Sequence, residues 1–371
     1  MSKDMNKKIF VKGGGTGGHI YPAVSVINEL IKLGIDKNNI FYIGNKKNLE
    51  YKIAKDNDFQ FLSTSVFGMP RKSSLSFIKW GICLFVSIIK ALAYAFKYKP
   101  DVIFATGGYV CAPALFMAKI LNIPYVLHDS DCYPGIVSRT FASGAKAVNL
   151  AFEDAKKYIK SDKIHFLNNP VRNQFFEITK EEARKKLNIN DEFLILIMGG
   201  SQGAKSINEA SIEVIKKFSN NDRIKIILQT GKKNYDEVIN GLDIPKNVQI
   251  EPYFDDMSLP ILASDLIVSR AGSISISEIL SSKNPSILVP YPYAAADHQR
   301  INAKSIVNKG AALYVEDEDL KQGELVLKIE NLLSDKEKYN QLKQNAALLG
   351  DRYAFATGEI ANLVLNAIKK A

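Results

Sequence analysis

Cysteine is scarce in this chain of 371 residues, and the three present, Cys83, Cys111 and Cys132, lack the number and spacing of a disulfide framework. The N-terminal residues, Met-Ser-Lys-Asp-Met-Asn-Lys-Lys, also lack the apolar core of a secretion signal. We therefore expect the protein to work in a reducing cytoplasm.

Two common nucleotide-binding signatures are incomplete. Gly13, Gly15 and Gly18 have the spacing of a dinucleotide fingerprint, but the next expected strand ends in Ile-Gly-Asn-Lys-Lys, without the carboxylate that would hold a ribose. Residues 203–206, Gly-Ala-Lys-Ser, do not have the Walker A spacing. Binding of NAD and hydrolysis of a nucleoside triphosphate at a P-loop are therefore disfavoured.

A basic face rich in aromatic residues is also missing. The formal charge of +10 is spread along the chain, which favours anionic partners in general. Nucleic-acid platforms interleave aromatic and basic side chains on one face, and no such stripe is visible here. We therefore expect no nucleic-acid partner.

Short apolar runs alternate with helical patterns in both halves of the chain. This alternation predicts α/β architecture with parallel sheets covered on both faces, and the length favours two domains. A turn-prone Asn-Asn-Pro-Val-Arg segment at residues 168–172 separates the halves. The predicted strands are residues 8–12, 40–43, 59–63, 102–105, 125–128 and 147–150, and then 193–198, 224–229, 248–251, 266–269, 286–289 and 313–315.

Glycine-rich loops follow several of these strands. Residues 13–22 read Gly-Gly-Gly-Thr-Gly-Gly-His-Ile-Tyr-Pro, between a strand and a helix. Glycines expose backbone N–H groups, and a helix N-terminus beside them favours an anionic or polar ligand. A second loop at residues 106–109, Thr-Gly-Gly-Tyr, should share the edge of the first sheet, because ligand loops follow the carboxyl ends of parallel strands.

The second half repeats this layout. Residues 199–203, Gly-Gly-Ser-Gln-Gly, follow an apolar strand and precede a helix expected over residues 206–218. Residues 269–278, Ser-Arg-Ala-Gly-Ser-Ile-Ser-Ile-Ser-Glu, predict a strand, a turn and a helix start suited to phosphate, with Glu278 in its first turn near a ribose. Gln299 and Asn302 offer amides for sugar hydroxyls, and His298 is expected beside the same ligand.

Residues 77–96 form a long apolar helix pattern interrupted by Lys79 and Lys90. A spanning helix needs about 20 mostly apolar residues, and these lysines argue against insertion. Its N-terminal part is either a core helix or an interfacial helix with Trp80 as a possible anchor, and the rest is expected to pack in the core. The flanking or interspersed basic residues are Arg71, Lys72, Lys79, Lys90, Lys97 and Lys99.

Taken together, these motifs resemble the MurG family of peripheral-membrane N-acetylglucosaminyltransferases. The resemblance rests on Gly-Gly-Thr-Gly-Gly-His at 14–19, Thr-Gly-Gly-Tyr at 106–109, Asn-Pro-Val-Arg at 169–172, Gly-Gly-Ser-Gln-Gly-Ala at 199–204, residues 273–278, and His-Gln at 298–299 with Asn-Ala at 302–303. It covers nearly the whole chain in the family's order.

The resemblance implies a glycosyltransferase B-type fold, with two doubly wound, Rossmann-like domains facing across a cleft. Residues 1–168 would bind the acceptor and the membrane, with a final helix at about 352–371 packing back on them, and residues 169–351 would bind the donor. The implied reaction is inverting transfer of N-acetylglucosamine from UDP-N-acetylglucosamine to the C4 hydroxyl of MurNAc in undecaprenyl-diphosphate-MurNAc-pentapeptide, which converts lipid I to lipid II.

The family's motifs also imply roles for individual residues. Arg172 and Ser201 would face the donor diphosphate, Glu278 the ribose, Phe254 the uracil and Gln299 the sugar. The full donor set is Thr16, Gly17, Gly18, Asp131, Arg172, Ser201, Phe254, Ser273, Ile274, Ser275, Ile276, Ser277, Glu278 and Gln299. The acceptor side would be lined by Gly14, Gly15, Thr106, Gly107, Gly108 and Tyr109.

His19 is the candidate catalytic base, because an inverting transfer needs a base near the acceptor hydroxyl. The alternative is a histidine that only orders the glycines through hydrogen bonds. One departure from the family stands out: residues 128–131 are His-Asp-Ser-Asp where the family has His-Glu-Gln-Asn, so Asp131 replaces an amide. We interpret the Asp-Ser-Asp as a coincidental match to a metal motif, and we expect neither metal nor cofactor.

The expected partners are UDP-N-acetylglucosamine, the undecaprenyl-linked acceptor, an anionic membrane surface and cell-wall or division proteins, with roles in cell shape and the cell cycle. The expected location is the cytoplasmic face of the cell membrane. Two alternatives stay open: an enzyme of related fold that glycosylates diacylglycerol, and a non-catalytic scaffold that binds nucleotide sugars.

Overall fold

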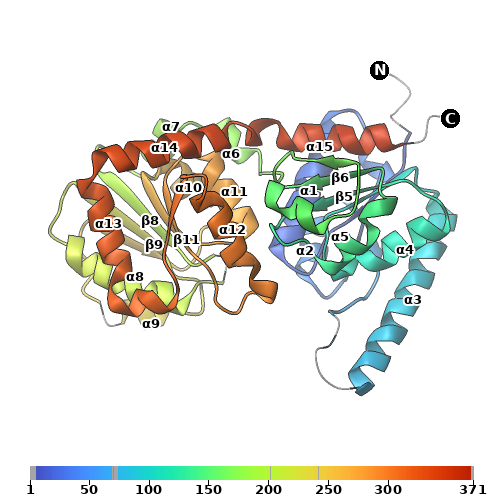
Figure 1. Ribbon diagram of the computed structural model, residues 1–371, viewed down its shortest axis with the longest axis horizontal. Helices are drawn as coiled ribbons and strands as arrows, with labels where there is room; N and C mark the ends of the chain where they lie inside the picture. The colour runs from blue at the N-terminus through green and yellow to red at the C-terminus, as the bar shows by residue number, and fades with distance from the viewer. Residues whose placement is uncertain (1–5, 69, 71–73, 201, 241, 369–371) are drawn as a thin grey trace. The chain divides into compact units, whose positions relative to one another are not determined.

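The computed structural model describes residues 6–68, 70, 74–200, 202–240 and 242–368. The chain divides into two compact units, residues 1–172 with 355–371, and residues 173–354 (Figure 1). Each unit is built around one parallel sheet flanked by helices, which confirms the predicted α/β class.

The first unit contains a seven-stranded sheet in the order β3-β2-β1-β4-β5-β6-β7. Its strands are β1 Ile9–Lys12, β2 Ile40–Gly44, β3 Gln60–Ser63, β4 Val102–Ala105, β5 Tyr125–Asp129, β6 Ala147–Leu150 and β7 Ile164–His165. Its helices are α1 Gly17–Lys32, α2 Leu49–Asp56, α3 Ser74–Tyr98, α4 Ala112–Ile120, α5 Ile136–Phe141 and the final α15 Tyr353–Ala367, with short 3₁₀ turns η1 Lys37–Asn39, η2 Tyr109–Cys111, η3 Ala142–Gly144 and η4 Glu153–Tyr158.

Successive residues of each strand pack on opposite faces of this sheet, as the pleat requires. Ile9 and Val11 of β1 pack with α1 and with Ile360 and Val364 of α15, whereas Phe10 packs with α3 and α4. A strand buried on both faces reads as a continuous apolar run, which is why these strands were predictable. The exception is β7, whose two half-buried residues carry no such pattern.

The second unit contains a six-stranded parallel sheet in the order β10-β9-β8-β11-β12-β13. Its strands are β8 Phe193–Met198, β9 Ile224–Gln229, β10 Val248–Glu251, β11 Leu266–Arg270, β12 Ser286–Val289 and β13 Ala312–Tyr314. Its helices are α6 Gln174–Glu177, α7 Lys180–Lys186, α8 Lys205–Phe218, α9 Tyr235–Ile239, α10 Ser258–Ala263, α11 Ser273–Ser281, α12 His298–Val307, α13 Glu324–Ser334 and α14 Lys336–Gly350, with 3₁₀ turns η5 Ala295–Asp297 and η6 Glu318–Gln322.

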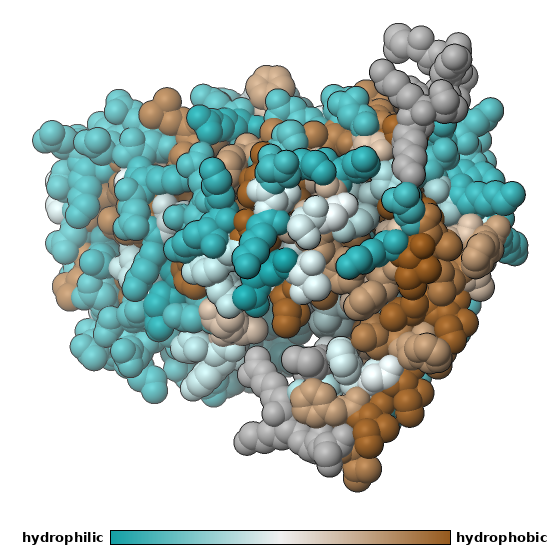
Figure 2. Space-filling view, turned by 45° about the vertical axis from the view of Figure 1, so that its right-hand side comes forward, coloured by the Kyte–Doolittle hydropathy of each residue, from teal (hydrophilic) through white to brown (hydrophobic). Residues whose placement is uncertain are grey.

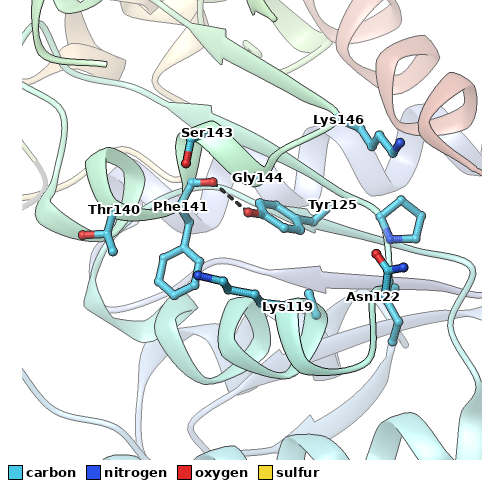
Figure 3. A pocket seen from close by; sticks show the side chains of 11 residues that line it. Lys119, Asn122, Tyr125, Thr140, Phe141, Ser143, Gly144 and Lys146 are labelled. Atoms are coloured by element: carbon cyan, nitrogen blue, oxygen red, sulfur yellow. Dashed lines mark hydrogen bonds between the residues drawn. The ribbon is translucent and has the colours of Figure 1, made fainter. Parts of the chain in front are cut away.

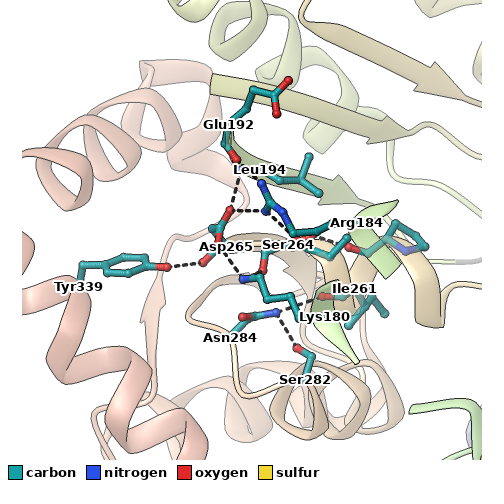
Figure 4. A network of polar contacts seen from close by, with 12 residues as sticks. Lys180, Arg184, Glu192, Leu194, Ile261, Ser264, Asp265, Ser282, Asn284 and Tyr339 are labelled. Carbon is teal, nitrogen blue, oxygen red and sulfur yellow. Dashed lines mark hydrogen bonds and ion pairs between the residues drawn. The ribbon is translucent and has the colours of Figure 1, made fainter. Parts of the chain in front are cut away.

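A network of ion pairs and hydrogen bonds lies at the amino-terminal edge of this second sheet (Figure 4). The Asp265 carboxylate, just before β11, pairs with Lys180 at 2.7 Å and Arg184 at 3.0 Å, both from α7, and accepts the Leu194 N–H at 2.9 Å. Tyr339 of α14 donates its hydroxyl to the Asp265 carbonyl. One carboxylate therefore ties α7 to the starts of β8 and β11.

The apolar helix predicted at residues 77–96 is α3, and most of it lies outside the core. Within 75–98 it is long and apolar enough to cross a membrane by length and composition, and only 11% of its most apolar window is buried. Among the helix residues whose burial the structure describes, 75–98, only a narrow stripe of Ser87, Ala91 and Ala95 is buried. The preference for core packing beyond the N-terminal part is therefore wrong at least as far as Ile89, which is 49% exposed.

Candidate functional site

The first glycine loop lies where the order of strands in the first sheet reverses, between β1 and β4. Gly13 follows β1, Thr16 is the N-cap of α1, and Tyr42 from β2 donates its hydroxyl to the Gly13 carbonyl. A Cβ at Gly13 would lie 2.4 Å from both the His19 carbonyl oxygen and the Thr106 hydroxyl oxygen. The chain packs so closely here that only glycine fits.

The second loop, after β4, contacts the first. Thr106 donates its hydroxyl to the His19 carbonyl at 2.7 Å, and Gly15 lies beside the Tyr109 ring and hydroxyl. Gly108 has a φ of 74°, and a Cβ there would lie 2.9 Å from the His19 ring. The prediction that both loops share one edge of the sheet is confirmed, and six predicted acceptor residues meet there: Gly14, Gly15, Thr106, Gly107, Gly108 and Tyr109.

His19 is the third residue of α1, so it lies at a helix N-terminus. Its imidazole is held by packing against Gly108, and its Nδ1 is buried without a hydrogen-bond partner among the described residues. Nδ1 therefore does not order the glycine loop through a hydrogen bond to any described residue. A buried imidazole nitrogen with unused capacity has the chemistry of a base or a ligand contact.

The end of β5 lies beside these loops. Ser130 donates its hydroxyl to the Gly18 carbonyl at 3.2 Å, so the segment that carries Asp131 lies against the start of α1. Asp129 is buried and accepts the N–H groups of Gly135 and Asp131, so its carboxylate faces inward. Burial, together with the nearby charge of Asp131, raises the pKa of Asp129 to about 6.

The Asn-Asn-Pro-Val-Arg connector belongs to the first unit by its contacts. His128 of β5 lies 3.0 Å from Asn169 Oδ1 and 2.9 Å from Asn149 Nδ2, so its Nε2 donates and its Nδ1 accepts. Burial, despite the bond to Asn169, lowers the pKa of His128 to about 3 and keeps it neutral. Arg172 follows, with its guanidinium carbon 5.9 Å from the centre of the Tyr21 ring.

The predicted donor residues thus divide between the units. Thr16, Gly17, Gly18, Asp131 and Arg172 lie in the first unit, and the others are in the second.

The order of strands in the second sheet also reverses, between β8 and β11, and predicted donor loops follow both strands. After β8, Gly203 has a φ of 75°, and a Cβ there would lie 1.9 Å from the Thr230 carbonyl oxygen. Gly203 therefore packs directly against the end of β9, two residues before α8 begins. Ser201 lies outside the described residues.

After β11, Gly272 caps α11, and the first N–H bond back to Gly272 comes from Ile276. The N–H groups of residues 273–275 therefore lie at the start of the helix, a position where backbone N–H groups can donate hydrogen bonds to an anion. Ile276 and Ser277 are buried, and Ser277 donates its hydroxyl to the Ser273 carbonyl. Glu278 is the sixth residue of α11 and not in its first turn, because the helix begins at Ser273.

The remaining predicted donor residues follow neighbouring strands of the same sheet. Phe254 is half-buried in the loop after β10. Gln299, in the first turn of α12, accepts the Tyr291 N–H on its Oε1 at 3.0 Å. His298 begins the same helix and bonds the Ala295 carbonyl through Nδ1 at 2.6 Å.

A cavity of about 470 Å³ lies elsewhere, at the amino-terminal edge of the first sheet (Figure 3). It is bordered by the end of α4, the Asn122 turn that enters β5, and the α5–β6 connection with Lys146. Tyr125 lines it and donates its hydroxyl to the Phe141 carbonyl. None of the predicted site residues lies here, so this cavity is separate from the glycine loops.

Two buried charges at the strand ends were not predicted. Lys12 ends β1 and is 2% exposed; its ammonium donates to Thr64, and burial lowers its pKa to about 8. Arg270 ends β11 and is 8% exposed. A charged residue directly after an apolar run was the available signal for both. No group of three or more His, Cys, Asp or Glu side chains is placed to hold a metal within the described part of the chain.

Comparison with known proteins identifies the family. Residues 9–150 match the N-terminal domain of glycosyltransferase family 28, and residues 194–356 match its C-terminal domain. The chain is 36% identical to the UDP-N-acetylglucosamine–N-acetylmuramyl-(pentapeptide) pyrophosphoryl-undecaprenol N-acetylglucosamine transferase of Halothermothrix orenii, over 98% of this chain and 99% of the relative. It is 35% identical to the enzyme of the same name from Acetivibrio thermocellus, over 92% and 94%.

Solved structures agree on the fold. The crystal structure of Acinetobacter baumannii MurG superposes with a TM-score of 0.74 at 23% identity, over 97% of this chain and 99% of that one. A kitacinnamycin glycosyltransferase gives 0.73 at 16% identity, over 98% and 99%. The B-type glycosyltransferase fold is confirmed, and the chain belongs to the MurG family of N-acetylglucosaminyltransferases within glycosyltransferase family 28.

Proposed function

We propose that this chain moves N-acetylglucosamine from UDP-N-acetylglucosamine to the C4 hydroxyl of MurNAc in lipid I, with the donor held mainly by the second unit and the acceptor by the first. The observation that carries the proposal is the 35–36% sequence identity, over more than 90% of this chain, to enzymes named for this transfer. The clustering of the predicted site residues at the carboxyl edge of each sheet supports it.

On the donor side, we propose that the start of α11 receives the diphosphate with Ser201 and Arg172, and that Glu278, Phe254 and Gln299 bind ribose, uracil and sugar. Helix N-termini and an arginine can stabilise the negative charge that develops on departing UDP. We therefore expect transfer to proceed without a metal, and activity should persist in excess EDTA. The expected cleft between the units stays a prediction.

On the acceptor side, we propose His19 as the base that removes the proton from the C4 hydroxyl. Its position at the start of α1, against Gly108 of the second glycine loop, supports this role. A positioned base contributes roughly 10²–10⁴-fold to a rate. His19→Gln should lower kcat by that factor and leave the affinity for UDP-N-acetylglucosamine nearly unchanged.

The test uses purified full-length protein, labelled UDP-N-acetylglucosamine and three separate acceptors: lipid I, diacylglycerol and none. Transfer to lipid I alone, lost in His19→Gln, would support the proposal. Transfer to diacylglycerol alone would refute it, and a wild type that binds donor without any transfer would favour the scaffold alternative.

We also propose that α3 places the protein on an anionic membrane surface. Figure 2 shows apolar side chains gathered over this helix, and Ile78, Ile82 and Phe85 are each at least 60% exposed. Lys79 and Lys90 are exposed on the same helix and can attract acidic headgroups. Such an amphipathic surface fits binding in the plane of the interface.

Ile82→Asp with Phe85→Asp should abolish co-sedimentation with vesicles of phosphatidylglycerol and phosphatidylethanolamine. Leu348→Asp, on α14, is the matched control, because Leu348 is 69% exposed but lies in the second unit. Equal vesicle binding by the α3 variant and the wild type would remove α3 from the proposal. Lys72 falls outside the described residues, so Lys79→Glu with Lys90→Glu tests the charge contribution.

A further inference from the structure

Arg270 and Arg300 hold the two ends of one loop in the second unit. The loop, residues 290–297, connects β12 to α12 and leads directly into Gln299. Its residues Ala296 and Asp297 have φ values of 51° and 54°, in the left-handed region that side chains other than glycine rarely adopt. Such a backbone persists only where the surrounding contacts impose it.

Arg270 fixes the start of this loop. Its Nη1 donates to the carbonyls of Val289 at 3.3 Å and Pro290 at 3.0 Å, and pairs with Asp317 at 2.5 Å. Its Nη2 donates to the Ser206 hydroxyl at the start of α8. Arg270 is only 8% exposed, so these contacts are largely shielded from bulk water.

Arg300 fixes the end of the loop. Its three nitrogens donate to Asp297 Oδ2 at 3.0 Å, Glu316 Oε2 at 3.0 Å and the Tyr314 hydroxyl at 3.2 Å. Tyr314 in turn donates to Glu316 Oε1 at 2.6 Å. Because Glu316 and Asp317 are adjacent after β13, the two arginines are anchored to one short segment.

We infer that Arg270, Arg300, Glu316 and Asp317 form a clasp that positions Gln299 for the N-acetylglucosamine of the donor. This inference rests on the proposed role of Gln299. The clasp fixes the loop whose Tyr291 N–H binds the Gln299 carbonyl oxygen, so it sets the orientation of that amide. The residues proposed for uracil and ribose, Phe254 and Glu278, belong to other elements, so the clasp acts on the sugar end of the donor.

The test compares Glu316→Gln, Arg300→Lys and Tyr314→Phe with the wild type in the full-length enzyme. Glu316→Gln should raise the KM for UDP-N-acetylglucosamine about tenfold, because a charge-assisted contact is lost. The inhibition constant of UDP, which lacks the sugar, should change less than about twofold. Arg300→Lys should raise this KM less than Glu316→Gln does, since lysine keeps the charge without the planar fork. Tyr314→Phe should also raise it less, because it removes the hydroxyl that accepts from Arg300 and donates to Glu316 but leaves the Arg300–Glu316 ion pair in place.

Glu330→Gln is the matched control, because it breaks the 2.7 Å ion pair with Lys217 in the same unit, outside the clasp. This variant should change neither the KM for UDP-N-acetylglucosamine nor the inhibition constant of UDP. Equal loss of UDP and UDP-N-acetylglucosamine affinity in the clasp variants, or wild-type constants in all three, would overturn the clasp. A wild type that neither binds nor transfers N-acetylglucosamine would instead refute the proposed function, and the positioning role with it.

Discussion

His128 and Asp129 are adjacent on β5, and their pKa values predict pH effects of opposite sign. Burial lowers the pKa of His128 from 6.5 to about 3, so the unfolded chain binds its proton first as the pH falls, and stability is lost. Burial and Asp131 raise the pKa of Asp129 from 3.8 to about 6, so the folded protein binds that proton first, and stability is gained.

Integrating these pKa differences from pH 7 to pH 5 gives a size for each effect. Between pH 7 and pH 5, His128 should lower the free energy of unfolding of the first unit by about 2 kcal/mol, and Asp129 should raise it by about 1 kcal/mol. These two residues together should therefore leave the wild type about 1 kcal/mol less stable at pH 5. His128→Gln should remove the loss of stability at pH 5 that His128 causes. Asp129→Asn should remove the gain of stability that Asp129 causes.

Urea unfolding at both pH values, followed by fluorescence of Trp80, measures the effect, because this single tryptophan of the chain lies in α3 of the same unit. Each variant is compared with itself at the two pH values, so a constant loss of stability from the substitution cancels. Relative to the wild type, the change from pH 7 to pH 5 should shift by about +2 kcal/mol in His128→Gln and about −1 kcal/mol in Asp129→Asn. Shifts of the same sign would refute the assignment of these buried groups.

Two further perturbations test the packing of each unit. Gly13→Ala should destabilise the first unit by about 1–3 kcal/mol and reduce transfer, since its methyl group would overlap the His19 carbonyl and Thr106; unchanged urea unfolding would contradict the 2.4 Å approach. Asp265→Ala should cost the second unit about 1–3 kcal/mol by removing the carboxylate that Lys180, Arg184 and the Leu194 N–H share, as measured by hydrogen exchange in β8 and β11. Glu213→Ala, which breaks an exposed pair with Lys216, should cost less than about 0.5 kcal/mol, and equal losses would be evidence against the half-buried network.

The sequence predicted the strands well, because parallel strands buried on both faces are continuous apolar runs. It also placed the glycine loops, since a strand, a glycine cluster and a helix follow one another in the chain. β7 was missed because its two residues are held by pairing with β6 alone and carry no apolar pattern. The position of α3 was misjudged because periodicity shows an apolar face without showing what covers it.

The site depends on contacts that periodicity does not encode. Glu278 was placed one turn too early, because the five serine and isoleucine residues at 273–277 gave no sign of where α11 begins. Burial keeps His128 neutral, and its tautomer is fixed by amides from β6 and the connector, which are distant in sequence. Such partners become visible only when the sheet brings them together.

Charged residues at the ends of buried strands form a pattern that links these findings. Lys12, Asp129 and Arg270 each end an otherwise uncharged, buried strand, and none is more than 8% exposed. Each contacts a neighbouring segment: Lys12 contacts Thr64 after β3, Asp129 the Gly135 N–H, and Arg270 the Pro290 carbonyl. A charge at this position, desolvated and already bonded to protein groups, is better suited to fixing a loop than to meeting a substrate. His19 lies at the carboxyl edge of the first sheet without such a bond at its Nδ1 among the described residues, and α11 begins at the carboxyl edge of the second sheet.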